Sequence, residues 1–282
     1  MTTFGGSWTE EKLDKVTKYL AAYQNVMKKQ SFRTVYVDAC CGDGTIAMKD
    51  DDTAEGRRIA KGAATRALEL DPPFAAYHFI DKSAASVNAL KTAAASIRPG
   101  LETRVHVHAE DVNTALPRII GGLNTRTDRA VVFVEPFGMQ LDWATVQAVA
   151  AKPIVDFWYL VPIGIAVNRL ATNDASRMSE AWAKRLDAFL GTKAWRTEWY
   201  APSPQGNLFT ADRAMERHVD IDKINEYFHK RLGEAFHKVA PNQLRLGKTK
   251  TKPLYTLMFA CSNPSEKAHG AAIRIANHLL KS

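Results

Sequence analysis

Hydrophobic positions along the first 163 residues follow two alternating patterns. Between residues 13 and 27 they recur at intervals of three and four, which predicts an N-terminal helix with one buried face, extending to about residue 30. Short β-branched and aromatic runs then alternate with stretches of helical periodicity. The runs that predict strands are 34–39, 75–81, 103–111, 129–138 and 153–163. The stretches that predict helices are 57–70 (in its second half), 83–97, 113–123 and 141–151.

This alternation predicts the fold class. Almost continuously apolar strands separated by single helices are typical of a parallel sheet that is covered on both faces. Because crossover connections are right-handed, such a sheet is expected to be doubly wound. We therefore predict a mixed α/β protein with a doubly wound, mostly parallel sheet and a helical insertion.

The pattern changes after residue 163. Two helical stretches follow, 166–190 and 224–239, and between them residues 193–207 are aromatic and rich in Pro and Gly, which predicts irregular structure. A late strand and an amphipathic helix are predicted at 253–264 and 265–281. The predicted organisation is an N-terminal helix and α/β core at 1–163, a helical insertion or cap at 164–252, and a strand and helix at 253–282 that complete the core.

Composition limits the class of protein further. The chain has 282 residues, of which 46% are hydrophobic, enough for one large domain or for one domain with an insertion. No apolar run approaches the roughly 20 residues of a membrane span, and the first residues lack the pattern of a signal peptide. The cysteine count is odd, and Cys40 and Cys41 are adjacent, so no disulfide framework is indicated. We expect a cytoplasmic protein that has no membrane segment.

The net charge of +8 and a pI of about 9.3 favour an anionic partner, nucleic acid above all, although a merely soluble basic protein has the same balance. The densest basic stretch is 238–253, and its Pro and Gly content predicts a loop. This loop either grips phosphates or is a solvated connection. Its candidate nucleic-acid contacts are Arg245, Lys248, Lys250 and Lys252.

Acidic residues and glycines gather where the predicted strands end. In a doubly wound sheet, ligands bind at the carboxyl ends of the strands. The first strand leads into Asp38, Gly42, Asp43 and Gly44, the second into Asp81, the third into Glu110 and Asp111, and the fourth into Glu135, Pro136, Phe137 and Gly138. Glycines allow a tight turn that approaches a ligand closely, and carboxylates suit an ammonium group or ribose hydroxyls better than a bare pyrophosphate.

These residues predict a nucleoside ligand with a cationic tail. Asp81 is placed to accept hydrogen bonds from both ribose hydroxyls, and Asp111 could accept one from an adenine amino group. S-adenosylmethionine has this chemistry. The turn CGDGT is not GxGxxG, and no GxxxxGK[ST] motif or zinc-ligand spacing occurs, so we predict no nicotinamide, P-loop or metal site. The alternative is that the glycines only form a turn and that Asp81 and Asp111 only cap helices.

The strand-end motifs VYVDACCGDGT, HFIDKS, HAEDVN and VFVEPFG resemble those of class I S-adenosylmethionine-dependent methyltransferases. With the N-terminal helix EKLDKVTKYLAAY, KGAATRAL and the late PLYTLMFACSNP, their order resembles the bacterial three-Cys-motif partner protein family. The family's three cysteines belong to the partner protein, so Cys40, Cys41 and Cys261 do not inherit that role. The resemblance implies a cofactor site at Asp38, Cys40, Gly42, Gly44, Asp81, Lys82, Asp111 and Val112.

The fourth strand end is the predicted catalytic position. In amino-group methyltransferases a polar residue here accepts hydrogens from the target nitrogen, and an aromatic residue stacks on a flipped base. By analogy Glu135 would orient or deprotonate the acceptor, and Phe137 would form an apolar wall. Pro136, between them, completes the predicted catalytic residues. Glu135 stands where family members commonly have Asp. The alternatives are a plain turn with Phe137 in the core, and a nucleophilic Cys40 or Cys41.

Three functions remain open at this point. The first is methyl transfer to a nucleic-acid acceptor, which the strand-end constellation and the net charge favour. The second is a non-catalytic or accessory binding protein that partners another enzyme, which the family resemblance implies. The third is methyl transfer to a protein or small molecule, with residues 164–252 forming the acceptor pocket.

Overall fold

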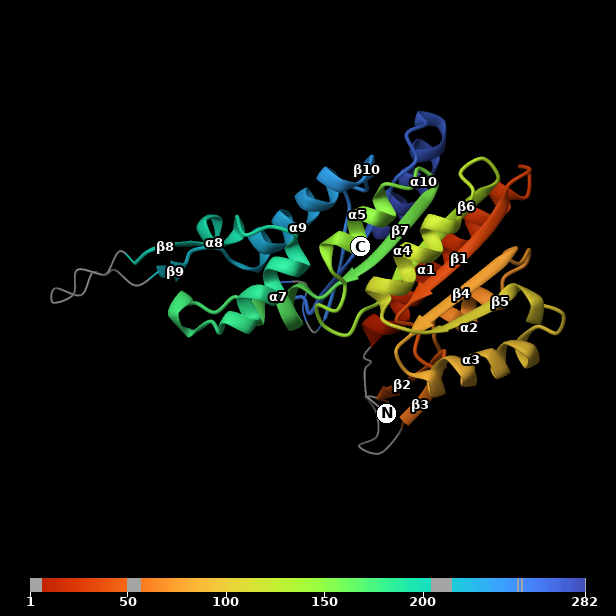
Figure 1. Cartoon of the computed structure of the whole chain (residues 1–282), viewed down its shortest axis with the longest axis horizontal. Coiled ribbons are helices and arrows are strands. Elements are labelled where there is room, and N and C mark those ends of the chain that lie inside the picture. The colour runs from red at the N-terminus through yellow and green to blue at the C-terminus, as the bar shows by residue number, and fades with distance from the viewer. Residues whose placement is uncertain (1–6, 50–56, 204–214, 248, 250, 282) are drawn as a thin grey trace.

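The computed structural model describes residues 7–49, 57–203, 215–247, 249 and 251–281. Its centre is an eight-stranded sheet (Figure 1). The strands are β1 (Arg33–Ala39), β4 (Ala76–Asp81), β5 (Val105–Ala109), β6 (Asp128–Val134), β7 (Val155–Val161), β10 (Lys238–Val239), β11 (Leu244–Leu246) and β12 (Tyr255–Cys261). Their order is β10-β12-β7-β6-β1-β4-β5, and β11 also pairs with β12.

Helices cover both faces of this sheet. One face packs against α1 (Ser7–Met27), α2 (Ala63–Leu68), α3 (Ala84–Ile97) and α10 (Glu266–Leu280). The other packs against α4 (Val112–Gly122), α5 (Trp143–Ala150), α7 (Glu180–Leu190) and α9 (Ile221–Ala235). Strands β5, β4, β1, β6 and β7 run parallel, and β12 runs antiparallel to β7. The predicted doubly wound, mostly parallel α/β fold is confirmed.

Alternate residues of each strand point to opposite faces, and this decides which side chains meet. In β1, Val35, Val37 and Ala39 pack on the α4 side, whereas Tyr36 packs on the α1 side. Asp38 has the same parity as Tyr36, so it also points toward α1. The parallel strands all end at one edge of the sheet. Tyr255, the first residue of β12, lies at this edge as well, because its neighbour Thr256 pairs with Val161 at the end of β7.

The remaining elements lie outside the central sheet. Two antiparallel hairpins are β2 (Thr45–Lys49) with β3 (Arg57–Lys61), and β8 (Tyr200–Pro202) with β9 (Met215–Arg217). The connections contain 3-10 turns at Glu102–Arg104 and Ala175–Arg177, a π-helical turn at Ile163–Val167, and the short helices α6 (Asn168–Leu170) and α8 (Trp195–Glu198). The segment 193–207 is therefore not wholly irregular, since α8 and β8 form within it.

The predicted loop at 238–253 is also partly wrong. It contains β10 and β11, both of which pair with β12. Leu244 and Leu246 are buried against the α1 side of the sheet, and their burial favours a strand despite the neighbouring Pro and Gly.

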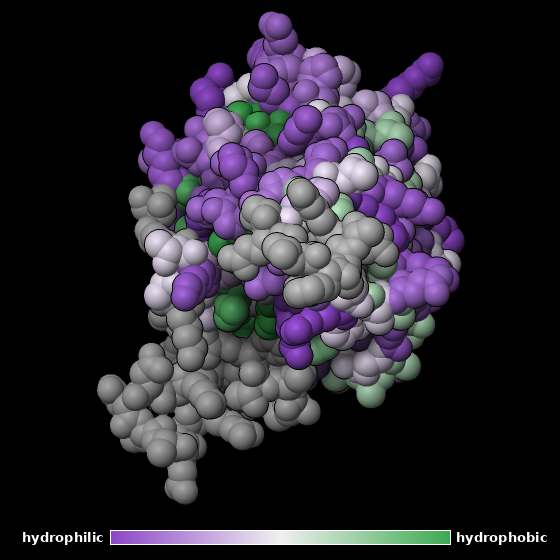
Figure 2. All heavy atoms as spheres, turned by 90° about the vertical axis from the view of Figure 1, so that its left-hand side faces the viewer, coloured by the Kyte–Doolittle hydropathy of each residue, from purple (hydrophilic) through white to green (hydrophobic). Residues whose placement is uncertain are grey.

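Part of the segment 164–252 forms one end of the molecule, with α7, α8, β8 and β9 at the left of Figure 1. Figure 2 views this end directly, and most side chains drawn in colour there are hydrophilic, with hydrophobic ones in small separate patches. Large apolar side chains exposed on its described elements are Trp182 and Met215. None of the helices in the described ranges is long and apolar enough to cross a membrane.

Candidate functional site

A pocket of about 590 Å³ lies where the parallel strands end. It is bounded by the turn after β1, the ends of β4 and β6, the base of the β2–β3 hairpin, the first turns of α1 and the start of β12. Seven of the residues predicted to form the site line it: Asp38, Cys40, Gly42, Asp81, Glu135, Pro136 and Phe137. The topology therefore brings together side chains that are nearly 100 residues apart in the sequence.

Four predicted cofactor residues do not line this pocket. Gly44 lies behind it with a φ of 78°, where a Cβ would meet Leu90 and Thr65 at 2.6 and 2.9 Å, so packing explains this glycine. Val112 is buried in the core. The Lys82 ammonium pairs with the Asp111 carboxylate at 2.7 Å. That carboxylate also accepts the backbone N–H of Asn113, which caps α4.

Asp81 is held rigidly at the pocket wall. Its two carboxylate oxygens accept hydrogen bonds from the backbone N–H groups of Gly42, at 3.1 Å, and Ser83, at 2.8 Å. Gly42 has a φ of 58°, and a Cβ there would meet no atom within 4 Å, so its backbone borders open space. The turn after β1 and the end of β4 thus form one unit, in which a carboxylate stands beside an accessible stretch of backbone.

The pocket floor contains a buried group of charged residues that the sequence did not reveal. Lys12 of α1 has a side chain that is 0% exposed, and its ammonium forms an ion pair with Glu135. The Glu135 side chain remains 33% exposed and lines the pocket. Because Asp38 pairs in register with Phe133, and Glu135 follows two positions later, both carboxylates point to the face that α1 covers.

Burial keeps the Asp38 carboxyl protonated near neutral pH. Burial first, and then the nearby charge of Glu135, raise the pKa of Asp38 to about 8. The Tyr36 hydroxyl donates a hydrogen bond to Asp38 at 3.1 Å, and this bond, together with Lys12, acts in the opposite direction on the same pKa. The floor therefore holds one ammonium, one carboxylate and one neutral carboxyl group.

Aromatic side chains form part of the pocket wall. Trp8 of α1 stacks on Tyr255 of β12, with ring centroids 5.4 Å apart, and both rings line the pocket. Phe137 is 62% exposed, and its backbone N–H donates to the Gln140 side chain at 3.1 Å. The alternative in which Phe137 belongs to the core is wrong, because most of its side chain is exposed.

The two cysteines of the turn have environments that suppress their reactivity. Burial, followed by the charge of Asp81, raises the pKa of the Cys40 thiol to about 12. Burial and Asp38 raise the pKa of the Cys41 thiol as well. The side chains pack against opposite cores, Cys40 on the α4 side and Cys41 on the α1 side. Because the nucleophile is the thiolate, neither cysteine is suited to covalent catalysis.

The charge of the lining limits which ligands can bind. Asp38, Asp43, Asp81 and Glu135 contribute carboxyl groups, and no lysine or arginine is found among the described residues that line the pocket. A ligand with several phosphate groups would meet uncompensated repulsion here, whereas a neutral or cationic ligand would not.

Comparisons with known proteins agree with this architecture. Neither a known protein-family model nor a curated protein matches the sequence. The solved structure of protein LPL1258 from Legionella pneumophila is similar, with a TM-score of 0.55 and 11% identity, covering 98% of this chain and 92% of that one. The fold is Rossmann-like. At this identity the likeness to LPL1258 shows the fold alone.

Two matching structures with Rossmann-like architecture are more distant. Trm1 from Pyrococcus horikoshii, in complex with S-adenosyl-L-methionine, has a TM-score of 0.48 and 11% identity, covering 98% of this chain and 59% of that one. The methyltransferase domain of bacterial CtHen1 has a TM-score of 0.42 and 14% identity, covering 88% of this chain and 99% of that one. Neither likeness determines what the present protein binds.

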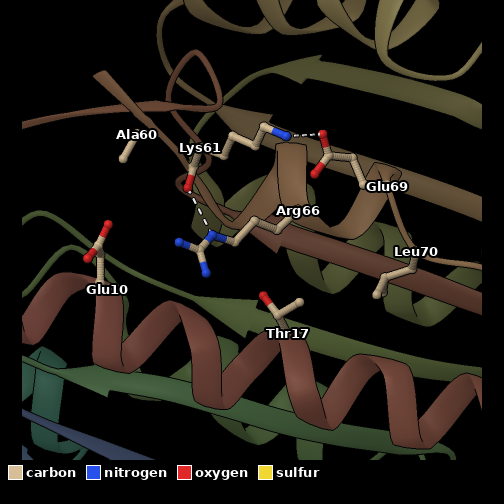
Figure 3. A pocket seen from close by; sticks show the side chains of 7 residues that line it. All are labelled: Glu10, Thr17, Ala60, Lys61, Arg66, Glu69 and Leu70. Carbon is tan, nitrogen blue, oxygen red and sulfur yellow. Dashed lines mark hydrogen bonds and ion pairs between the residues drawn. The ribbon is translucent and has the colours of Figure 1, made fainter. Parts of the chain in front are cut away.

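A second hollow, of about 500 Å³, lies between α1 and α2 (Figure 3). Its cations are already engaged: Lys61 pairs with Glu69 at 2.5 Å, and Arg66 pairs with a carboxylate of α1. The Arg66 guanidinium also donates to the backbone carbonyl of Lys61 at 3.1 Å. None of the residues predicted to bind a ligand lines this hollow, so the strand-end pocket is the candidate site of the Rossmann-like fold.

Of the predicted nucleic-acid contacts, Arg245 and Lys252 are not among the residues that line the pocket. Leu246 pairs with Tyr255, so the connection between them leaves and rejoins the sheet at the pocket edge. Arg245 is engaged with Asp222 of α9 at 2.6 Å, whereas Lys252 is exposed. Lys248 and Lys250 lie outside the described residues. Within the described ranges, no group of three or more His, Cys, Asp or Glu side chains is arranged to hold a metal ion.

The sequence reasoning missed Lys12, Trp8, Tyr36 and Tyr255. A signal for Lys12 exists, because it precedes Val16 by four residues and Tyr19 by seven and so falls on the buried face of α1. A lysine on an apolar helix face requires a buried partner, and the partner had to be a carboxylate on the strands below.

Proposed function

We propose that this protein binds S-adenosylmethionine in the strand-end pocket and transfers the methyl group to a nucleic-acid acceptor. The observation that carries the proposal is the charge of the lining: four carboxyl residues and, among its described residues, no basic one. Such a pocket selects a nucleoside that has a cationic tail over a nucleoside phosphate. Its volume, about 590 Å³, lies within the range of small-molecule sites.

The chain's own groups fit this ligand. Asp81, fixed by two backbone N–H groups, has lone pairs left to accept hydrogen bonds from ribose hydroxyls. The open backbone at Gly42 permits close approach of the nucleoside. The carboxyl groups of the floor and wall favour a positive charge. S-adenosylmethionine, when bound, supplies an electrophilic methyl group on a sulfonium.

The acceptor side of the pocket is formed by Glu135 and Phe137. Lys12 engages one oxygen of Glu135, so the carboxylate is held in one orientation with its exposed part toward the pocket. A carboxylate held in this way can accept hydrogen bonds from an amino group and orient its lone pair. The exposed ring of Phe137 offers a stacking surface for a base. Methyl transfer depends mainly on such positioning.

A nucleic-acid acceptor is supported by the net charge of +8 and by the basic connection that ends beside Tyr255. Phosphates would contact this connection outside the acidic pocket while one base entered it. Of the predicted contacts, Lys252 is exposed and Arg245 is paired with Asp222. The phosphate contacts are therefore proposed at the three lysines and not at Arg245.

The Lys12–Glu135 ion pair also favours a second candidate function. If the pair leaves Glu135 unable to serve an acceptor, the protein would bind the cofactor without transferring its methyl group, as an accessory protein of another enzyme. The partner protein implied by the family resemblance would be the enzyme that such an accessory protein assists. Labelled methyl transfer to total RNA and DNA separates the two functions, because catalysis requires transfer that is lost in Glu135→Gln while cofactor binding is kept.

Calorimetry with S-adenosylmethionine tests the premise that both functions share. We expect Asp81→Asn to weaken binding about tenfold or more, since hydrogen bonds to a charged group contribute roughly 1.5–3 kcal/mol each. Glu110→Gln is the matched control, because Glu110 also follows a strand but pairs with Arg118 outside the pocket. Equal affinities of the two variants would exclude the proposed ribose site.

A further inference from the structure

We propose that Asp38 distinguishes the sulfonium cofactor from its uncharged thioether product, by releasing its proton to solvent when the cation binds. This inference rests on the proposed function and deepens it. It concerns the pocket floor, where Asp38 is 2% exposed and yet lines the cavity. The product, S-adenosylhomocysteine, has the same nucleoside and amino-acid tail as the cofactor and differs in having no charge on sulfur.

The groups that face Asp38 come from every element around it. Tyr36 of the same strand donates a hydrogen bond to its carboxyl. Glu135, beyond β6, and Asp81, at the end of β4, add negative charge, and Lys12 of α1 adds positive charge. The thiols of Cys40 and Cys41 lie in the turn that follows and stay neutral.

Among the described residues, the Lys12 ammonium acts on both Asp38 and Glu135, and it pairs directly with Glu135. Asp38 forms no ion pair with any residue that the structure describes, and protonation is the way a buried carboxyl without a counter-ion avoids an unpaired charge. A sulfonium in the pocket would supply the missing positive charge. The Asp38 O–H bond then breaks, the proton leaves to solvent, and the floor plus ligand remain neutral overall.

Proton movement at Asp38 reverses after the methyl group has been transferred. The thioether has no charge, so an ionised Asp38 would again be uncompensated and would take a proton back. The pocket therefore favours the cofactor over the product most strongly where Asp38 can ionise. The pKa of Asp38, about 8 in the protein alone, falls when the cation binds. By linkage, affinity for the cofactor rises as pH increases toward about 8 and is constant above it.

Calorimetry in two buffers of different ionisation enthalpy measures the protons released on binding. At about pH 7 we expect S-adenosylmethionine to release close to one more proton from the natural protein than from Asp38→Asn. S-adenosylhomocysteine should show no such difference. The cofactor-to-product affinity ratio should rise roughly 20- to 50-fold between about pH 6 and pH 8, and should stay constant in Asp38→Asn. Comparing variants with one ligand removes any titration of the ligand's own amino group.

A second variant tests the role of the cluster itself. Tyr36→Phe removes a hydrogen bond that favours the ionised form, so it should move the pH midpoint of cofactor binding upward while proton release persists. A merely structural role for Asp38 would leave that midpoint unchanged. Binding with equal proton release in the natural protein and Asp38→Asn would overturn this inference and leave the cofactor site intact. Failure of the cofactor to bind at any pH would overturn both proposals.

Discussion

Burying a lysine is unfavourable unless its charge is neutralised, and in this chain an ion pair neutralises Lys12. Its side chain is fully buried, and its ammonium is paired with Glu135, which keeps a third of its own side chain exposed. Removal of one member of a buried ion pair leaves the other uncompensated, which costs far more than the pair contributes in net stability. The ion pair thus makes the orientation of Glu135 depend on α1.

We expect Lys12→Met to lower the free energy of unfolding by about 3 kcal/mol, at the lower end of the range for a buried pair, because water still reaches Glu135. Lys15→Met, on the same helix, is the control, since the Lys15 ammonium donates a long hydrogen bond, 3.4 Å, to the exposed backbone carbonyl of Lys281. Urea unfolding measures both. The double variant Lys12→Met/Glu135→Gln should recover part of the stability lost in Lys12→Met. Equal stabilities of Lys12→Met and Lys15→Met would contradict the pairing.

At the scale of elements, the turn after β1 uses its two glycines for different purposes. Gly44 supports packing, because a Cβ there would meet the Leu90 side chain at 2.6 Å. Gly42 supports access, because a Cβ there would meet nothing within 4 Å and would stand at the pocket. Both have positive φ, so each Ala substitution also has a backbone cost of about 1 kcal/mol.

These differences separate stability from binding. Gly44→Ala should lower the free energy of unfolding by about 2–4 kcal/mol, the backbone cost plus overpacking. Gly42→Ala should lower it by only about 1 kcal/mol but should weaken S-adenosylmethionine binding at least as much as Asp81→Asn does. Thermal unfolding and calorimetry on both variants provide the two readouts. A larger loss of stability in Gly42→Ala than in Gly44→Ala would show that the turn packs differently.

Strand periodicity and turn chemistry made this edge of the sheet predictable. An acidic residue lies at or just after the end of β1, β4, β5 and β6, and parallel pairing then places Asp38, Asp81 and Glu135 together without further information. Asp111 was harder, because the same residue type caps a helix as readily as it contacts a ligand, and here it caps α4. The Lys12–Glu135 pair depends on how α1 lies across the sheet, which the pattern of α1 alone does not specify.

At the scale of the whole molecule, charge is divided between an acidic pocket and a basic exterior. The charged side chains of the lining described above are all carboxylic acids, while the protein as a whole has a net charge of +8. The fold brings the two together, since β11 and β12 deliver the basic connection to the pocket edge at Leu246 and Tyr255. Under the proposed function, a polyanion would be held outside while one uncharged base reached the acidic interior.

Replacing Lys248, Lys250 and Lys252 by alanine should test this division of charge. If these lysines contact phosphates, nucleic-acid affinity falls and the salt dependence of log K becomes shallower by about 2 to 3, because each lost contact removes roughly 0.7–0.9. The matched control removes the same charge by changing three exposed residues, Lys267 and Arg274 of α10 and Lys281 just after it. The contacts of α10 are with α1 and the β10–β12 side of the sheet. Fluorescence anisotropy across a salt series measures both variants.

Equal losses of nucleic-acid affinity in the two variants would assign binding to net charge alone. An unchanged salt slope in the loop variant would exclude the loop as the phosphate-binding element. S-adenosylmethionine affinity should be unaffected in either variant, since Lys252, Lys267, Arg274 and Lys281 are not among the residues that line the pocket.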